Sequence, residues 1–147
     1  MPTATTSTDT AALAARLRLA VTRLARKLRR EAEPGITPSM LAALSSVDRQ
    51  GPLTMSELCA VEQVQPPSMT RIVAALVEVG LVTRESDPSD GRVAWVTVTR
   101  EGRKLLERSR GRKEAYLAKA LRGLGAHELE TLEEAAVILE GLTGGQS

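Results

Sequence analysis

Residues 87–102 read Asp-Pro-Ser-Asp-Gly-Arg-Val-Ala-Trp-Val-Thr-Val-Thr-Arg-Glu-Gly, and this stretch decides the fold. Its first six residues combine Asp, Pro and Gly, which is the composition of a tight reversal of the chain. The next residues alternate as in a β-strand with one buried face, and residues 81–85 are a strand candidate before the turn. Thr99 then opens a Thr-x-x-Gly helix start. The pattern predicts a two-stranded hairpin, or wing, whose turn presents Arg92.

A helix candidate lies upstream of this wing and begins at Pro66, where a missing N–H costs nothing. Its apolar residues recur at spacings of three and four, which predicts a buried stripe made of Met69, Ile72, Val73 and Leu76. Gly80 is well placed to end the helix in a left-handed conformation. A helix that can enter a groove, followed by a wing that carries Arg, is an arrangement that contacts DNA at two points.

The other helical patterns complete a mainly α (α+β) fold of the winged helix-turn-helix type. Thr54 and Glu57 form a capping box that opens a short helix before the one at Pro66. The first helix and the last two are amphipathic but lie far from the DNA-reading unit in sequence. Pairing their apolar stripes with a second chain is the economical solution. A two-fold dimer would also place two recognition helices about 34 Å apart, one turn of DNA.

These patterns divide the chain into five segments, of which the outer two are short tails. The segments are a disordered tail at residues 1–8, a dimerisation helix at 9–35, a winged helix-turn-helix DNA-binding domain at 36–99, C-terminal dimerisation helices at 100–143 and a tail at 144–147.

Charge and composition narrow the possible partners. The 147 residues carry a formal net charge of only +2, and residues 51–99 hold three basic and six acidic groups. That acidic balance counts against strong non-specific DNA binding, which rests on Lys and Arg, but allows specific binding through a few placed arginines. No apolar run approaches the roughly 20 residues that span a bilayer, and no export signal is evident. We therefore expect a cytoplasmic protein with no membrane partner.

Four motifs in the right order resemble the MarR family of bacterial transcriptional regulators. They are Pro67-Ser68-Met69-Thr70-Arg71, Leu76-Val77-Glu78-Val79-Gly80-Leu81-Val82, Asp90-Gly91-Arg92 and Val98-Thr99-Arg100-Glu101-Gly102. The resemblance implies a homodimer on a palindromic operator in double-stranded DNA, usually a repressor, with no enzymatic activity and no cofactor. In many members a small aromatic or phenolic effector releases the DNA, and in others cysteine oxidation does. The chain departs from the family in carrying Gln65 before the recognition helix and in lacking the frequent Gly turn at residues 61–64.

Arg92 is the residue we expect at the wing tip, within reach of the minor groove, because narrow A·T-rich grooves attract Arg. Gly91 lies beside it in the turn. The family resemblance implies that Asp90 holds its guanidinium in place. The alternative is a solvated turn charge, since exposed ion pairs alone mean little.

Ser68, Thr70 and Arg71 are the residues we expect in the major groove. Arg can pair with guanine through two hydrogen bonds, and hydroxyl groups can reach bases or phosphates. Gln65 and Pro67 are weaker candidates at the same helix start. For Ser68 and Thr70 the alternative is ordinary helix-start hydrogen bonding.

Other candidates have a structural reading that is at least as good as the functional one. Thr54 and Ser56 open a helix whose N–H groups could meet a phosphate, but plain capping explains them. Cys59 could be a redox switch, although a small core residue is the better reading. Trp95 and Tyr116 are weak candidates for a ligand site, and packing explains Trp95. With one His and one Cys in the chain, no His/Cys zinc site can form, so no metal is expected.

Two rival functions stay open at this point. A winged-helix module that binds protein rather than specific DNA is compatible with the acidic middle segment, and a salt series with duplex DNA would discriminate the two. An enzyme is disfavoured because no catalytic set, paired carboxylate motif or phosphate-binding Gly loop stands out.

Overall fold

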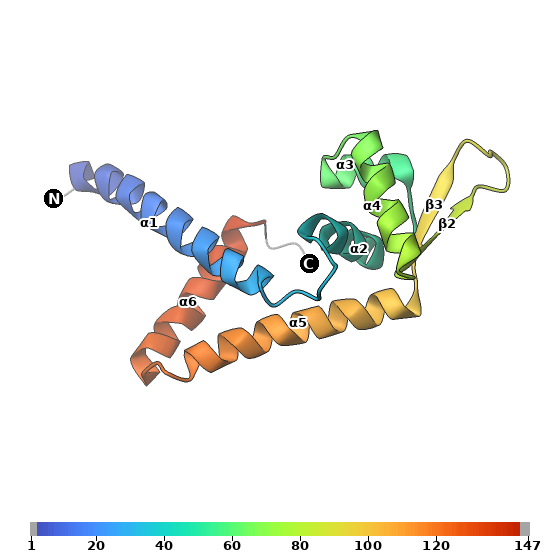
Figure 1. The fold of residues 1–147 in the computed structure, drawn as a ribbon. Helices are drawn as coiled ribbons and strands as arrows, with labels where there is room; N and C mark the ends of the chain where they lie inside the picture. The colour runs from blue at the N-terminus through green and yellow to red at the C-terminus, as the bar shows by residue number, and fades with distance from the viewer. Residues whose placement is uncertain (1–2, 145–147) are drawn as a thin grey trace. The chain divides into compact units, whose positions relative to one another are not determined.

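The computed structural model describes the backbone of residues 3–144 and the side chains from residue 9 to 144. It contains six helices and three strands in that range. Figure 1 shows the helices and the two strands of the hairpin. In chain order they are α1 Thr3–Arg29, α2 Pro38–Gln50, β1 Leu53–Thr54, α3 Met55–Glu62, α4 Pro66–Glu78, β2 Val82–Ser86, β3 Ala94–Val98, α5 Arg100–Leu121 and α6 Ala126–Leu142. The predicted mainly helical winged fold is confirmed.

Two features differ from the expectation. Helix α1 begins at Thr3, so residues 3–8, expected to be disordered, form its first turns and Asp9 lies inside the helix rather than at its cap. Strand β1 was not predicted, because its two residues read only as the start of a helix cap. The remainder of the expected tails, residues 1–2 and 145–147, lies outside the described residues.

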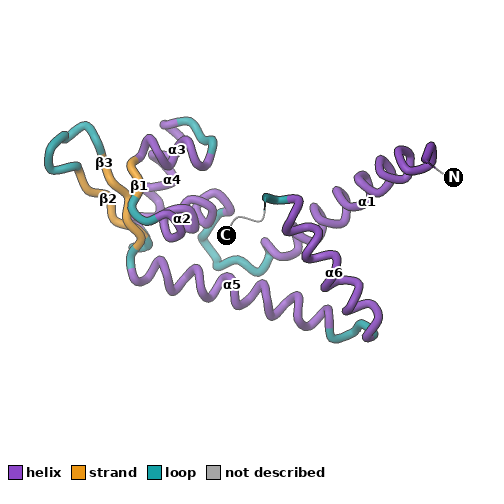
Figure 2. Tube along the Cα trace, turned by 180° about the vertical axis from the view of Figure 1, so that it is seen from behind, coloured by secondary structure: helices purple, strands orange, loops and turns teal. Residues whose placement is uncertain are grey.

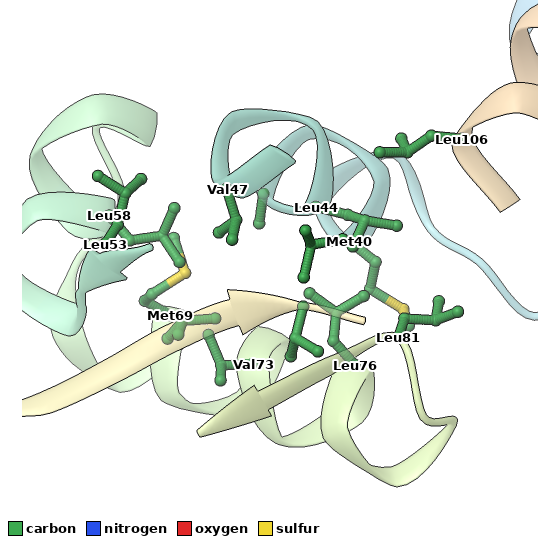
Figure 3. Close-up of a cluster of buried hydrophobic side chains, with 14 of the residues drawn as sticks. Met40, Leu44, Val47, Leu53, Leu58, Met69, Val73, Leu76, Leu81 and Leu106 are labelled. Atoms are coloured by element: carbon green, nitrogen blue, oxygen red, sulfur yellow. The ribbon is translucent and has the colours of Figure 1, made fainter. Parts of the chain in front are cut away.

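The chain forms two compact units, one ending at Lys113 and the other beginning at Glu114, within α5. The first unit holds the hydrophobic core. Because the chain has no Phe, aliphatic side chains fill this core. Figure 3 shows side chains from α2, α3 and α4 converging there, among them Leu44, Val47, Leu58, Met69, Val73 and Leu76, all fully buried. Leu106 adds the first part of α5.

The three strands form one antiparallel sheet in the order β1-β3-β2 (Figure 2). Val82 lies opposite Val98, and the register continues to Ser86 opposite Ala94. On the other edge Leu53 lies opposite Val96. The base of the hairpin β2–β3 is therefore part of the core, and its far end is the predicted turn.

A junction at Gly80 joins the end of α4 to the start of α5. Gly80 has φ 78°, its N–H donates to Val77, and the N–H of Leu81 donates to Leu76 at 2.9 Å, which closes the helix in a left-handed cap. The Thr99 hydroxyl donates to the carbonyl of Gly80 at 2.7 Å and accepts from the N–H of Gly102 at 3.1 Å. A Cβ on Gly102 would lie 2.3 Å from the carbonyl oxygen of Leu81. Only glycine fits there.

We expect Gly102→Ala to lower the free energy of unfolding by about 2–3 kcal/mol, because the clashing atom belongs to the backbone and cannot turn away. Gly111→Ala is the matched control on the same helix, since nothing lies within 4 Å of its added Cβ. That control should raise stability by roughly 0.5–1 kcal/mol, the usual gain of Ala over Gly in a helix. Urea unfolding of both variants checks this. Equal shifts for the two would contradict the close approach at Gly102.

Candidate nucleic-acid interface

Helix α4 separates a buried face from an exposed one, as its sequence pattern predicts. Met69, Val73 and Leu76 are fully buried against the core. The opposite side exposes Thr70 and Arg71. The candidates Gln65 and Pro67 are also exposed, and Ser68 is half-buried. The structure therefore brings all five expected groove residues to the first two turns of one helix.

The start of α4 explains the unusual Gln65. Gln65 occupies the N-cap position with extended backbone and makes no side-chain cap hydrogen bond. The next two residues are Pro66 and Pro67, which have no N–H to satisfy, so a capping side chain has less to do here. The Thr70 hydroxyl donates to the carbonyl of Pro66 at 2.9 Å. In this structure Thr70 thus makes the ordinary helix-start bond, while Arg71 is left pointing away from the core.

The turn between α3 and α4 contains no Gly, and Gln63 takes the left-handed position instead. Gln63 adopts φ 54°, the left-handed conformation that glycine usually supplies at a helix end. Its N–H donates to Ala60, and the N–H of Val64 donates to Cys59 at 3.1 Å. The helix-turn-helix is therefore closed without glycine.

The capping box at the start of α3 is present as predicted. The Thr54 hydroxyl accepts from the N–H of Glu57 at 3.1 Å, and the Glu57 carboxylate accepts from the N–H of Thr54 at 2.9 Å. Ser56, one residue into the helix, is exposed. The Thr54 hydroxyl is thus engaged in capping. The Ser56 side chain, by contrast, is exposed to solvent.

The wing turn holds Arg92 in a defined orientation. The Asp90 carboxylate accepts from the backbone N–H of Arg92 at 3.0 Å and from its Nε at 3.1 Å. The pKa of Asp90 lies below its usual range. The hydrogen bond from the Arg92 side chain is the main cause, and the bond from the Arg92 backbone N–H adds to it. The Arg92 side chain is nevertheless 92% exposed, so its guanidinium is oriented and still free to contact a partner.

A second aspartate braces the same turn. The Asp87 carboxylate accepts from Trp95 Nε1 at 2.9 Å, from the N–H of Ser89 at 2.9 Å and from the N–H of Asp90 at 3.1 Å. The bond from Trp95 is the largest cause of the lowered pKa of Asp87. Trp95 is half-buried and tied to the wing, which favours the packing interpretation over a ligand site. This hydrogen bond between Trp95 and Asp87 was not predicted from the sequence.

The remaining candidates do not gather into a site. Tyr116 is half-buried in the second unit, and His127 is exposed at the start of α6. Cys59 is half-buried, packed against the core and free of disulfides. Residues 3–144 contain no cluster of His, Cys, Asp and Glu that could hold a metal. No helix in this range is long and apolar enough to cross a membrane.

A cavity of about 410 Å³ in the first unit was not predicted. Its walls come from the end of α1, from α2 and from α5: Arg29, Pro38, Leu41, Ala42, Ser45, Leu106, Ser109, Arg110 and Lys113. The Ser109 hydroxyl is buried and has no hydrogen-bond partner among the described residues. The lining therefore combines apolar side chains with three cations, Arg29, Arg110 and Lys113.

Ion pairs on α5 connect this region to the rest of the unit. Arg103 and Arg110 lie 3.5 and 3.7 Å from the carboxylate of Asp48 on α2. Arg108 and Arg112 lie 3.0 and 3.1 Å from the carboxylate of Glu33. The hydrogen bond from Arg108 is the main cause of the lowered pKa of Glu33.

Large apolar side chains of α1 and α6 are exposed on the single chain. They include Leu13, Leu17, Val21 and Leu24 on α1, and Leu129, Leu132, Val137, Ile138, Leu139 and Leu142 on α6. Val137 and Ile138 are 68% and 65% exposed. These side chains make α1 and α6 candidate interaction surfaces.

Because Trp95 is the one tryptophan of the chain, its fluorescence should report on the Asp87 brace. The folded pKa of Asp87 lies below the ordinary value of 3.8, so the brace stabilises the wing above that value and is lost as pH falls through the folded pKa. We expect constant emission from pH 7 down to about 5, where an ordinary aspartate is still ionised, and a change only at lower pH. Asp87→Asn should remove that transition.

Circular dichroism at each pH separates this event from unfolding of the whole chain. A wild-type emission change centred at or above pH 3.8, with the helices intact, would contradict the lowered pKa of Asp87.

Comparisons with known proteins agree with this geometry. Residues 36–94 match the model of the MarR family. An HTH-type transcriptional regulator of Mycobacterium leprae is 40% identical over 132 residues, which cover 88% of this chain and 92% of the relative. The HTH-type transcriptional repressor MdtR of Bacillus subtilis is 30% identical over 95 residues, 65% of this chain and 61% of the relative. The crystal structure of a transcriptional regulator protein from Pseudomonas aeruginosa has a TM-score of 0.82 at 34% identity, covering 92% of this chain and 96% of that one.

Proposed function

The chain belongs to the MarR family of DNA-binding transcriptional regulators and is not an enzyme, and from this premise we propose that it is a homodimeric repressor of a palindromic operator. The observation that carries the proposal is the pairing of an exposed polar face on α4 with an oriented, exposed Arg92 on the wing. The name of the Bacillus subtilis relative, a transcriptional repressor, supports repression rather than activation. We also propose that the protein is cytoplasmic, because its DNA partner lies there.

In this proposal α4 lies in the major groove and the wing in the adjacent minor groove. Arg71 reads a base edge, with Ser68 and Thr70 as shorter-range polar contacts. Gln65 and Pro67 lie at the edge of the same contact. Arg92 enters the minor groove, and Asp90 lowers the entropy cost of ordering it. Thr54 is occupied by capping, so its part is to fix α3, and Ser56 is free to approach a phosphate.

The exposed apolar side chains of α1 and α6 support a dimer. In water they cost free energy that burial against a second copy would recover, at about 25 cal/mol per Å² of apolar surface. A two-fold axis would present two α4 helices to one palindrome. Sedimentation equilibrium should give twice the mass of the chain, and a monomer at micromolar concentration would contradict this part of the proposal.

We place the effector in the cavity between α1, α2 and α5. Its volume of about 410 Å³ suits a small molecule, and its apolar floor suits an aromatic ring. Arg29, Arg110 and Lys113 favour an acidic group on that ring. Such a ligand releases DNA only if it binds the DNA-incompetent spacing of the dimer more tightly. Trp95 and Tyr116 do not line this cavity.

Benzoate and phenol are simple probes of this cavity. Calorimetric titration should show that benzoate binds and that Arg110→Gln weakens it roughly tenfold, the usual worth of one charge-assisted hydrogen bond. Arg103→Gln is the matched control, because Arg103 also pairs with Asp48 but does not line the cavity. Equal loss in both variants, or binding of neither probe, would contradict an anion-binding cavity.

The operator contact is tested with DNA from upstream of the protein's own gene. We expect tight, site-specific binding that weakens steeply as salt rises, and a loss of roughly tenfold or more in Arg92→Ala. Arg49→Ala is the control, because Arg49 is exposed at the end of α2 and its removal changes the net charge equally. Fluorescence anisotropy measures both.

The rival function is a winged-helix module that binds protein. The acidic balance of residues 51–99 favours it, since that surface attracts phosphates weakly. Binding without sequence preference, the same in wild type and Arg92→Ala, would move this alternative to the front.

A further inference from the structure

Arg84 is a cation of the DNA-reading segment that has no partner among the side chains of residues 9–144. Residues 51–99 contain three basic residues, and the other two are Arg71 on α4 and Arg92 on the wing. Within residues 3–144 the Arg84 side chain makes no hydrogen bond and no ion pair. A free guanidinium in an acidic segment is available for an anion supplied from outside.

The strand register determines where this side chain lies. Residues two apart on a strand share a face, so Arg84 projects from the same face of β2 as the buried Val82. Its partner on β3 is Val96, which is fully buried. Arg84 therefore projects from the helix-covered face of the sheet, just beyond the edge of the core.

At that edge Arg84 lines a hollow of about 180 Å³. The other lining residues come from the start of α3 and from the start of α4: Met55, Ser56, Cys59, Pro66 and Thr70. No acidic side chain lines the hollow, although the segment as a whole is acidic. A guanidinium with the exposed Ser56 hydroxyl beside it is a donor set that suits a phosphate oxygen.

The hollow lies between the two DNA contacts of the proposed function. It is formed where α4 begins and where β2 leads towards the wing turn. If α4 occupies a major groove and Arg92 the adjacent minor groove, the sugar-phosphate strand that separates the two grooves must pass between them. We propose that Arg84 binds a phosphate of this strand, with the Ser56 hydroxyl as a second donor. This inference rests on the proposed mode of DNA binding.

A backbone contact differs from a base contact in what it changes. It sets the register of the protein on the duplex and carries no direct sequence information. Arg84→Ala should therefore weaken binding to operator and to unrelated duplex by a similar factor, roughly tenfold. It should also reduce the slope of log affinity against log salt by about one per protomer. Arg84→Lys keeps the charge and should keep most of the slope.

The experiment is a salt series with operator and unrelated duplex for wild type, Arg84→Ala, Arg84→Lys and Arg49→Ala. Arg49→Ala changes the net charge as Arg84→Ala does but lies at the end of α2, so its slope should equal that of wild type. Thermal unfolding should give equal melting temperatures for wild type and Arg84→Ala, because the side chain is exposed and unpaired.

Cys59, the one cysteine of the chain, gives an independent readout because it lines the same hollow. Saturating operator DNA should slow alkylation of Cys59 by iodoacetamide in the wild type. Unchanged alkylation would overturn the placement of the phosphate in this hollow.

The outcomes separate this inference from the proposed function. If wild type binds the operator tightly but Arg84→Ala has the same affinity and salt slope, Arg84 contacts no phosphate and the proposed function stands. If Arg84→Ala loses affinity for the operator alone, Arg84 reads a base and the backbone contact is wrong. If the wild type binds no DNA, the proposed function itself fails.

Discussion

The arrangement of α4, the wing and α5 depends on hydrogen bonds to the carbonyl groups of Gly80 and Leu81. Thr99 donates to both, through its hydroxyl to Gly80 and through its N–H to Leu81 at 3.0 Å, while Gly102 packs against the Leu81 oxygen. The end of α4, both ends of the hairpin and the first turn of α5 are thereby fastened at one place. Because interiors are close-packed, these elements respond to force together rather than separately. The first turn of α5 therefore contacts the end of α4 and the start of the hairpin directly.

Because residues 51–99 carry more acidic than basic residues, the position of each arginine matters more for DNA binding. With three arginines among residues 51–99, non-specific attraction to phosphates is weak, so discrimination depends on where each guanidinium is held. Arg92 is oriented by Asp90, and the turn that carries both is braced by Asp87 and Trp95. Among the described residues Arg71 and Arg84 make no such contacts, and in the proposed mode of binding both contact DNA. In the proposed mode of binding, affinity comes from preorganised arginines and from the two-fold symmetry of the dimer more than from net charge.

Local chemistry was predictable from the sequence and long-range chemistry was not. The capping box at Thr54, the left-handed end at Gly80 and the stripe of α4 each depend on residues a few positions apart. Strand β1 was missed because Leu53 pairs with Val96, far along the chain. The contact of Trp95 with Asp87 crosses a turn, and the large cavity collects side chains from three helices. Arg84 could not be predicted from the sequence, because the hollow that it lines forms only when α3 and α4 pack beside β2.

Hydroxyl-radical footprinting on the operator tests the two-point contact of a symmetric dimer most directly. We predict two equivalent protected regions related by the palindrome, with half-site centres about 10–10.5 base pairs apart or a multiple of that distance. Each half-site should show protection of the backbone beside the major groove and in the adjoining minor groove, and the minor-groove part should disappear in Arg92→Ala. A single protected half-site at saturating protein, or a footprint that Arg92→Ala leaves unchanged, would contradict it.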